Sequence, residues 1–375
     1  MSDHLAAGYD LVIFDLDGVI YLIDKPIQGA AEAVEQLRSG GTSIAYATNN
    51  ASRRAADVAA LLTGMGVKAA PAEVLTSAGA AAVLLAERFP AGAPILVVGA
   101  DALRAEVRDA GLNPVGSAED EPVAVIQGYG PEVGWKVLAE AALAVRAGAT
   151  WFATNTDKTL PSPRGPLPGN GSLVAVLRTA LDRDPDVVVG KPEPGLFTTA
   201  AERSEAKRPL AIGDRLDTDI EGAAGAGMDS LLVLTGVSGP ADLLAAPPHR
   251  RPTYVAADLS ALFHPAANAR IPVPGKDVPG KDVPGKEALG RDVPGEEALG
   301  EDTGAEISGE ARDGVAGAAA GWRVTRDGDR AVLDGSGDPV TALRLLCGVT
   351  WDGVPSSAIE AGSPEATELL HSWGL

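Results

Sequence analysis

The sequence predicts an α/β protein: a Rossmann-like parallel-sheet core, an inserted α/β domain, a disordered linker and a small α+β C-terminal piece. Short apolar runs alternate with helical patterns, which is typical of βαβ units. Composition then changes, because Pro and Gly dominate residues 265–320. Apolar residues make up 45% of the 375 residues, enough for a core, whereas 45 Gly and 28 Pro indicate segments that do not pack.

The first strand is predicted over residues 11–14, an apolar run followed by Asp15 and Asp17. An unbroken apolar run is typical of a strand buried on both faces of a parallel sheet. Residues i and i+2 of an extended chain point the same way, so the two carboxylates should lie on one side. Carboxylates that close repel each other, which favours a bound cation or a division of chemical roles.

The same patterns predict the remaining elements. Strands are predicted over 43–47, 95–98, 123–126, 151–153, 187–189, 210–212, 231–234 and 253–255. Helices are predicted over 29–39, 78–89, 102–110 and 133–147, and Ser52 is the predicted cap of another helix after residue 52. Residues 155–171, rich in Pro and Gly, are predicted to form a long loop without secondary structure.

The C-terminal third divides into a spacer and a small folded piece. Residues 265–320 contain a repeated Val-Pro-Gly-Lys-Asp pattern and no aromatic residue, which predicts a flexible linker. Two strands near Trp322 and Ala331 and a helix from Pro339 are predicted to follow. A piece of this size is marginally stable alone, so we expect it to pack on the main body or on a partner.

Charge and cysteine content restrict the function classes. A formal net charge of −20 argues against nucleic acid and anionic membranes as partners, because both reward basic patches. The single cysteine, Cys347, excludes an internal disulfide and fits a reducing compartment. No apolar run approaches the roughly 20 residues of a membrane-spanning helix, and we therefore expect a cytoplasmic protein. The four histidines show no ligand spacing, so no zinc site is expected.

Four polar residues follow apolar runs that are predicted to be parallel strands: Asp15, Thr48, Lys191 and Asp214. The carboxyl edge of such a sheet is where ligands bind. Taken singly, each residue has a structural interpretation as a helix cap, a surface lysine or a loop carboxylate. Together they are the residue types that phosphoryl transfer needs.

The chemistry suggests a role for each residue. Asp15 is the candidate nucleophile that forms an aspartyl-phosphate, and Asp17 is the candidate acid and base, which requires a raised pKa. Lys191 offsets negative charge on the phosphoryl group. Asp214 joins Asp15 in a site that suits Mg²⁺. Asp219 is expected to orient the ligands or their waters rather than to bind the metal.

The motifs DLDGV at 15–19, TNN at 48–50, GKPEPGLF at 190–197 and GDRLDTDI at 213–220 resemble the four motifs of the haloacid dehalogenase superfamily, in the same order. The resemblance implies Mg²⁺ dependence and metal ligation by Asp15, Asp214 and the main-chain carbonyl of Asp17. It also places Asn49 and Asn50, with Thr48 and Lys191, in the phosphate- or substrate-binding set.

The chain between Thr48 and Lys191 is several times longer than one crossover needs, which predicts an inserted domain. The predicted divisions are 1–79 core, 80–183 cap, 184–264 core, 265–320 linker and 321–375 C-terminal piece. This layout resembles the p-nitrophenyl phosphatase or NagD-like branch, whose caps favour small phosphomonoesters. Leu160, Asp157 and Tyr129 are the candidate specificity residues, although Asp157 fits a turn former better and Tyr129 fits core packing equally well.

The tryptophan-bearing C-terminal piece resembles the acetyltransferase-like fragment of bacterial glycerol-3-phosphate phosphatases. It is about half the length of an acyltransferase, so we interpret it as structural or regulatory and expect a protein without residues 265–375 to remain active. Glycerol 3-phosphate is the leading substrate; phosphoglycolate, pyridoxal phosphate and nucleoside monophosphates are alternatives. A phosphotransferase using the same aspartate also stays open, as does a homodimer formed through the cap.

Overall fold

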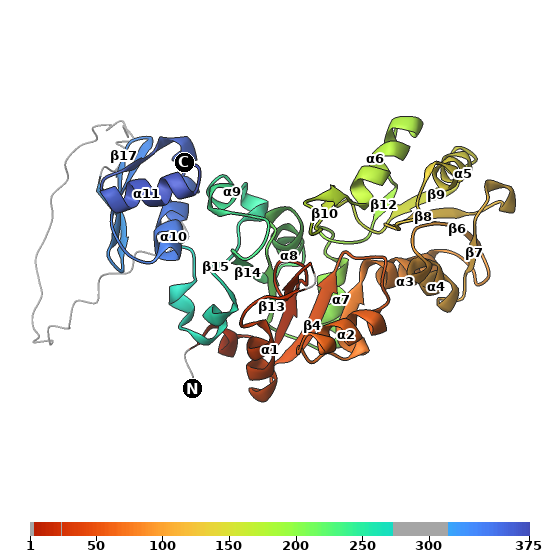
Figure 1. Ribbon diagram of the computed structural model, residues 1–375, viewed down its shortest axis with the longest axis horizontal. Helices are drawn as coiled ribbons and strands as arrows, with labels where there is room; N and C mark the ends of the chain where they lie inside the picture. Colours follow the sequence, from red (N-terminus) through yellow and green to blue (C-terminus); the bar gives the residue numbers. More distant parts are fainter. Residues whose placement is uncertain (1–3, 24, 273–313) are drawn as a thin grey trace, which may run out of the picture.

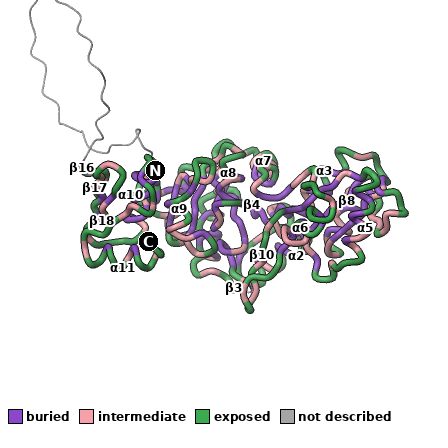
Figure 2. The backbone as a smooth tube through the Cα atoms, turned by 90° about the horizontal axis from the view of Figure 1, so that it is seen from above, coloured by how far each residue is buried: buried purple, intermediate pink, exposed green. Residues whose placement is uncertain are grey.

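The computed structural model describes residues 4–23, 25–272 and 314–375. The core sheet lies in the middle of an elongated molecule, with the cap at one end and the C-terminal module at the other (Figure 1). Buried residues follow the strands inside each of these three parts (Figure 2). None of the helices within the described ranges is both long and apolar enough to cross a membrane.

The core is a six-stranded parallel sheet in the order β15-β14-β13-β1-β4-β5. Its strands are β1 (Leu11–Phe14), β4 (Ser43–Thr48), β5 (Val74–Thr76), β13 (Pro209–Gly213), β14 (Asp229–Val233) and β15 (Tyr254–Ala256). In the central strands Phe14 lies opposite both Tyr46 and Ile212. The chain therefore leaves β1 and β13 at the same level of one edge, which sets the position of the site.

Apolar stripes on the helices bury both faces of the core sheet. Helices α1 (Ala30–Ser39) and α2 (Ala55–Gly64) contribute to one hydrophobic cluster, and α7 (Gly195–Arg203) and α8 (Glu221–Gly225) contribute to the opposite one. The predicted βαβ alternation is thus confirmed. The predicted cap of α2 is wrong: Arg54 precedes the helix, whereas Ser52 donates from its amide and its hydroxyl to Asn50 Oδ1.

The cap contains a second parallel sheet, in the order β12-β9-β8-β6-β7. Its strands are β6 (Pro94–Val98), β7 (Asn113–Val115), β8 (Ala124–Gln127), β9 (Thr150–Ala153) and β12 (Val187–Val188). Its helices are α3 (Ser77–Arg88), α4 (Asp101–Asp109), α5 (Trp135–Arg146) and α6 (Asn170–Leu181). The sequence placed residues 187–189 in the core, which is wrong, because β12 pairs with β9 of the cap.

The predicted loop over 155–171 is also partly structured. A short hairpin forms from β10 (Thr159–Leu160) and β11 (Leu167–Pro168), and α6 starts at Asn170. Two-residue strands are too short to produce an alternating pattern. The Gly-Asn-Gly sequence at 169–171 suggests a turn, yet Asn170 is buried and donates to Asn155 O (2.7 Å) and Gln127 O (3.2 Å).

The C-terminal module is a four-stranded sheet covered by two helices. Its elements are β16 (Gly314–Ala319), β17 (Trp322–Asp327), β18 (Arg330–Gly335), β19 (Ile359–Ala361), α10 (Pro339–Thr350) and α11 (Pro364–Ser372). The two predicted strands and the first helix are confirmed, and β16, β19 and α11 are additional. The module shares one hydrophobic cluster with core residues, so it packs on the main body as predicted.

Both ends of the predicted linker are structured. Residues 314–319 form strand β16, and Ile271 is buried in the cluster that joins the module to the core. Residues 266–268 form a turn of 3₁₀ helix. Residues 273–313 of the predicted linker lie outside the described residues.

Candidate active site

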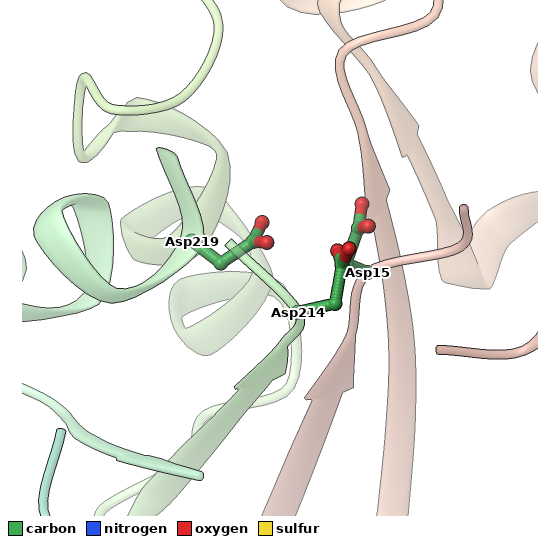
Figure 3. A group of neighbouring side chains, drawn as sticks. All are labelled: Asp15, Asp214 and Asp219. Atoms are coloured by element: carbon green, nitrogen blue, oxygen red, sulfur yellow. The ribbon is translucent and has the colours of Figure 1, made fainter. Parts of the chain in front are cut away.

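Three carboxylates meet at the carboxyl edge of the core sheet. Asp15 follows β1, Asp214 follows the neighbouring strand β13, and Asp219 lies in the helical turn Leu216–Ile220. One carboxylate oxygen from each lies within 4.8 Å of the others, and Asp219 reaches toward the other two from its turn (Figure 3). The cluster follows from topology, because adjacent parallel strands deliver their next residues to one place.

Two glycines keep space free around Asp214. A Cβ atom at Gly18 would lie 2.4 Å from Asp214 Oδ2, and one at Gly236 would lie 1.9 Å from the same atom. Gly18 also has a φ of 85°, a left-handed conformation that glycine adopts at little cost. The chain can therefore turn away from β1 directly beneath the Asp214 carboxylate.

Lys191 lies in the centre of the carboxylate cluster and is almost fully buried. Its Nζ donates to Asp15 Oδ1 (2.5 Å), Asp219 Oδ1 (2.7 Å) and Ala47 O (3.1 Å). Burial by itself would lower the pKa of Lys191, but Asp15 and Asp219 outweigh it and raise the pKa, so the ammonium stays charged. The lysine reaches this position from a loop after cap strand β12, and not from a core strand as predicted.

The pKa values of Asp15, Asp17 and Asp214 are shifted upward. Burial raises the pKa of Asp17 to about 6, against the opposing charges of Lys191 and Arg53. Burial, followed by repulsion from Asp219, raises the pKa of Asp214 to about 7. Burial also raises the pKa of Asp15, although Lys191 acts against the shift. The single positive charge of Lys191 therefore does not balance the negative charge of the carboxylates in the cluster.

The cluster fits a divalent cation. Asp214 Oδ2 accepts from Val237 N (2.7 Å), whereas its buried Oδ1 has no hydrogen-bond partner. A buried carboxylate oxygen without a donor is costly unless a cation binds it. The available side-chain ligands are oxygens of Asp15 and Asp214, the donor type that Mg²⁺ prefers. Asp219 accepts from Lys191 Nζ and from the Arg215 amide (3.1 Å), and its orienting role stays a prediction.

The TNN motif forms the side of the site nearest the cap. Thr48 Oγ1 accepts from Asn50 N (3.1 Å), which fixes the turn after β4. Asn49 Nδ2 donates to both carboxylate oxygens of Asp157 (3.2 and 3.1 Å) and to Lys191 O (2.9 Å). Asn49 is therefore the junction between the core motif, the cap loop and the lysine loop.

A cavity of about 720 Å³ lies over the carboxylate cluster and between core and cap. Asp15, Asp17, Thr48, Asn49, Asn50, Lys191 and Asp214 line its floor side, and Tyr129, Asp157 and Leu160 line its cap side. The structure thus brings every proposed specificity residue to the cavity. Asp219 does not line it, because Lys191 stands between.

Asp157 combines two of the interpretations left open by the sequence. Its amide donates to Asn155 Oδ1 (3.2 Å), as in a turn, while its carboxylate faces the cavity and Asn49. Burial raises the pKa of Asp157, with the positive charge of Arg215 opposing the shift. Asn155 donates in turn to Asn49 O (2.6 Å), so both side chains tie the cap to the core.

The sequence analysis missed two further contributors. Both Arg53, shortly after the TNN motif, and Arg215, inside the GDRLDTDI motif, line the cavity. The segment after β14 was also missed: Thr235 Oγ1 donates to Gly18 O (2.6 Å), and Val237 donates to Asp214. The only available signal was Gly236, a glycine soon after a predicted strand.

Comparisons with known families match three parts of the chain. The model for haloacid dehalogenase-like hydrolases matches residues 12–113, and a HAD-hydrolase-like model matches residues 188–262. A model for a GCN5-related N-acetyltransferase-like domain matches residues 319–375. The first two contain all four motifs, and the third coincides with the C-terminal module.

Two curated relatives are similar over long ranges. The chain is 41% identical over 378 residues to D-glycerol 3-phosphate phosphatase of Mycobacterium tuberculosis, covering 99% of this chain and 96% of the relative. It is 36% identical over 232 residues to acid sugar phosphatase of Staphylococcus aureus, covering 61% of this chain and 88% of the relative. The second alignment is too short to include the whole chain.

One solved structure is similar over nearly the whole chain, and another over about two thirds of it. A crystal structure of glycerol phosphate phosphatase from Mycobacterium tuberculosis with magnesium has a TM-score of 0.81, 38% identity and 99% coverage of both chains. The 4-nitrophenylphosphatase of Thermotoga maritima has a TM-score of 0.64 and 32% identity, over 69% of this chain and 98% of that one. The C-terminal module is therefore shared with the first structure.

Proposed function

We propose, from the premise that this chain belongs to the haloacid dehalogenase-like hydrolase family, that its substrate is glycerol 3-phosphate. The chain is a Mg²⁺-dependent phosphatase of that family, and the relationship predicted from the four motifs is confirmed. One observation carries the assignment of roles. Lys191 is paired with Asp15, while Asp17, two positions on, has a raised pKa.

In the proposed first step, a carboxylate oxygen of Asp15 attacks phosphorus and the bond from phosphorus to the glycerol oxygen breaks. Asp17 gives its proton to that oxygen, so glycerol leaves neutral and an aspartyl-phosphate remains. Lys191 stays charged beside Asp15 and offsets the added negative charge. A carboxyl group with a pKa of about 6 holds a proton often enough at neutral pH to act as this acid.

In the proposed second step, water attacks the same phosphorus. Asp17, now a carboxylate, removes a proton from the water, phosphate leaves, and the Asp15 carboxylate is restored. Asp15, Asp214 and the main chain at Asp17 would hold Mg²⁺, which shields charge on the phosphoryl oxygens when bound. Thr48, Asn49 and Asn50 line the cavity beside Asp15, where phosphoryl oxygens would lie.

The cap side of the cavity would select the leaving group. Leu160 is apolar, Tyr129 offers a hydroxyl, and the half-buried Asp157 carboxylate can accept a hydrogen bond from a substrate hydroxyl. A polyol such as glycerol supplies such donors. A leaving group with its own carboxylate, as in phosphoglycolate, would repel Asp157.

The test has two arms. Asp15→Asn should abolish phosphate release from glycerol 3-phosphate, and Asp101→Asn, an exposed cap aspartate, should retain it. Comparing kcat/KM for glycerol 3-phosphate, phosphoglycolate, pyridoxal phosphate and nucleoside monophosphates tests the substrate. Wild-type activity of Asp15→Asn would overturn the mechanism. A higher kcat/KM for another compound would overturn the substrate, and transfer to added alcohols exceeding release would indicate a phosphotransferase.

We also propose a cytoplasmic homodimer formed through the cap. Trp135 begins α5 and is 81% exposed, and Leu143, two turns later on the same helix, is 53% exposed. The buried, unpaired Cys347 fits a reducing compartment. Sedimentation should give a dimer for the wild type and a monomer for Trp135→Glu; a wild-type monomer would refute the dimer.

A further inference from the structure

The position of Asp214 depends on the segment that follows β14. Val237 N donates to Asp214 Oδ2 (2.7 Å), and Ser238 N donates to Asp214 O (3.0 Å). The Ser238 hydroxyl accepts from Leu216 N (3.0 Å), so the same segment also holds the turn that carries Asp219. Residues 237 and 238 thus fix both the side chain and the backbone of a predicted metal ligand.

Residue Gly239 follows this segment and precedes a short helix, α9 (Pro240–Leu244). Leu243 and Leu244 are buried in a hydrophobic cluster that also contains Leu216 and Ile220 of the turn that carries Asp219. The same cluster contains the buried face of α10 in the C-terminal module. Helix α9 contacts α10 of the module. Along the long axis of the molecule it lies between α10 and α8 of the core (Figure 1).

The module holds α9 through a tryptophan. Trp351 Nε1, at the end of α10, donates to Leu243 O (3.1 Å). The Arg251 guanidinium lies over the Trp351 ring, 5.1 Å from its centroid, and donates to Ala246 O (3.0 Å) and Trp351 O (3.3 Å). The carbonyls of Leu243 and Ala246 belong to the end of α9 and the residues just after it, so these bonds fix the helix relative to the module.

We propose that Trp351 is a positioning residue for Asp214, acting through α9 and residues 237–238, and that the C-terminal module is therefore needed for tight Mg²⁺ binding. The inference rests on the proposed function only in taking Asp214 as a metal ligand. The sequence predicted that a protein without residues 265–375 remains active; the inference adds that such a protein binds Mg²⁺ more weakly.

The expected effect falls on metal affinity rather than on substrate binding. Loss of a hydrogen-bond partner of a metal ligand typically weakens metal binding about 10- to 100-fold. Trp351 acts one step further away, so we expect Trp351→Ala to weaken Mg²⁺ binding roughly 3- to 10-fold. The KM for substrate and the kcat at saturating Mg²⁺ should change by less than about twofold, because the cavity lining does not include the module.

The experiment measures Mg²⁺ affinity of the full-length protein by calorimetry without substrate, and by activation of phosphate release from glycerol 3-phosphate. Trp373→Ala is the matched control, since Trp373 belongs to the same hydrophobic cluster and follows α11, which packs on β18 and β19. Trp351→Phe removes only the N–H donor and preserves most of the ring, so it provides a variant if Trp351→Ala does not fold.

Weakened Mg²⁺ binding in Trp351→Ala or Trp351→Phe, with unchanged binding in Trp373→Ala, supports the inference. Wild-type affinity in both Trp351 variants overturns it. Equal weakening in Trp373→Ala also overturns it, because the effect would then follow general loss of stability. A wild-type protein that binds Mg²⁺ but does not hydrolyse phosphomonoesters would instead refute the proposed function.

Discussion

The substitution Gly236→Ala tests directly whether free space around Asp214 is needed. The added Cβ would lie 1.9 Å from Asp214 Oδ2, and contacts below 3.0 Å essentially do not occur. Either Asp214 or residues 235–237 must therefore move by about 1 Å. A displacement of that size at a reacting centre typically costs about 100-fold in rate, and we expect kcat/KM to fall about 100-fold with Mg²⁺ affinity reduced in parallel.

The assay is phosphate release from glycerol 3-phosphate over a Mg²⁺ titration, together with thermal denaturation in the absence of metal. Gly116→Ala is the matched control, because a Cβ at Gly116 meets nothing within 4 Å. Gly236 does not have a left-handed φ, so backbone strain does not confound the steric effect. Near-normal kcat/KM and Mg²⁺ affinity in Gly236→Ala would refute the placement of the metal beside Asp214.

Three further predictions concern buried ionisable groups. Lys191→Ala removes the ion-pair partner of both Asp15 and Asp219 and should cost about 3 to 5 kcal/mol of unfolding free energy at neutral pH. Without Lys191 the pKa of Asp15, already raised by burial, rises further above its value in the unfolded chain. Protonation at low pH therefore stabilises the folded variant, and the loss of unfolding free energy should shrink as pH falls. Urea denaturation with a chelator at several pH values measures both the loss at neutral pH and its decrease at low pH. For Asp17, whose pKa is about 6, kcat/KM should fall as pH rises above that value, and Asp17→Asn should lack this dependence. Burial raises the pKa of Cys347, so iodoacetamide should modify this thiol in concentrated urea and not in the folded protein.

The core of the site could be predicted because each of its residues follows a strongly apolar run. Asp15 and Asp214 directly follow β1 and β13, and Thr48 is the last residue of β4. These strands are adjacent in the sheet, and the parallel register brings the three residues together. Strand order itself did not need to be known, since all carboxyl ends of a parallel sheet lie along one edge. The apolar runs and the four motifs were therefore sufficient to predict that Asp15, Thr48 and Asp214 lie together.

Lys191 shows what local pattern could not supply. Its preceding run, residues 187–189, looks like any other core strand, yet only hydrogen bonding to β9 places it in the cap. Pairing partners depend on tertiary packing rather than on the composition of one strand. The two-residue strands β10 and β11 are too short to produce an alternating pattern, and the edge strand β16 consists mainly of Gly and Ala, so none of the three was predicted.

The location of Lys191 has a consequence for how core and cap cooperate. The lysine loop begins at the cap edge strand, and its carbonyl accepts from Asn49, which also binds Asp157 and Asn155 of the cap. A rigid movement of the cap would therefore strain the loop that carries the ammonium group facing Asp15. Because the charge of Asp15, the proposed nucleophile, is balanced by that one lysine among the described residues, the position of the cap and the electrostatics of Asp15 are coupled. In the proposed mechanism, substrate selection by the cap and activation of Asp15 therefore depend on the same set of contacts around Asn49.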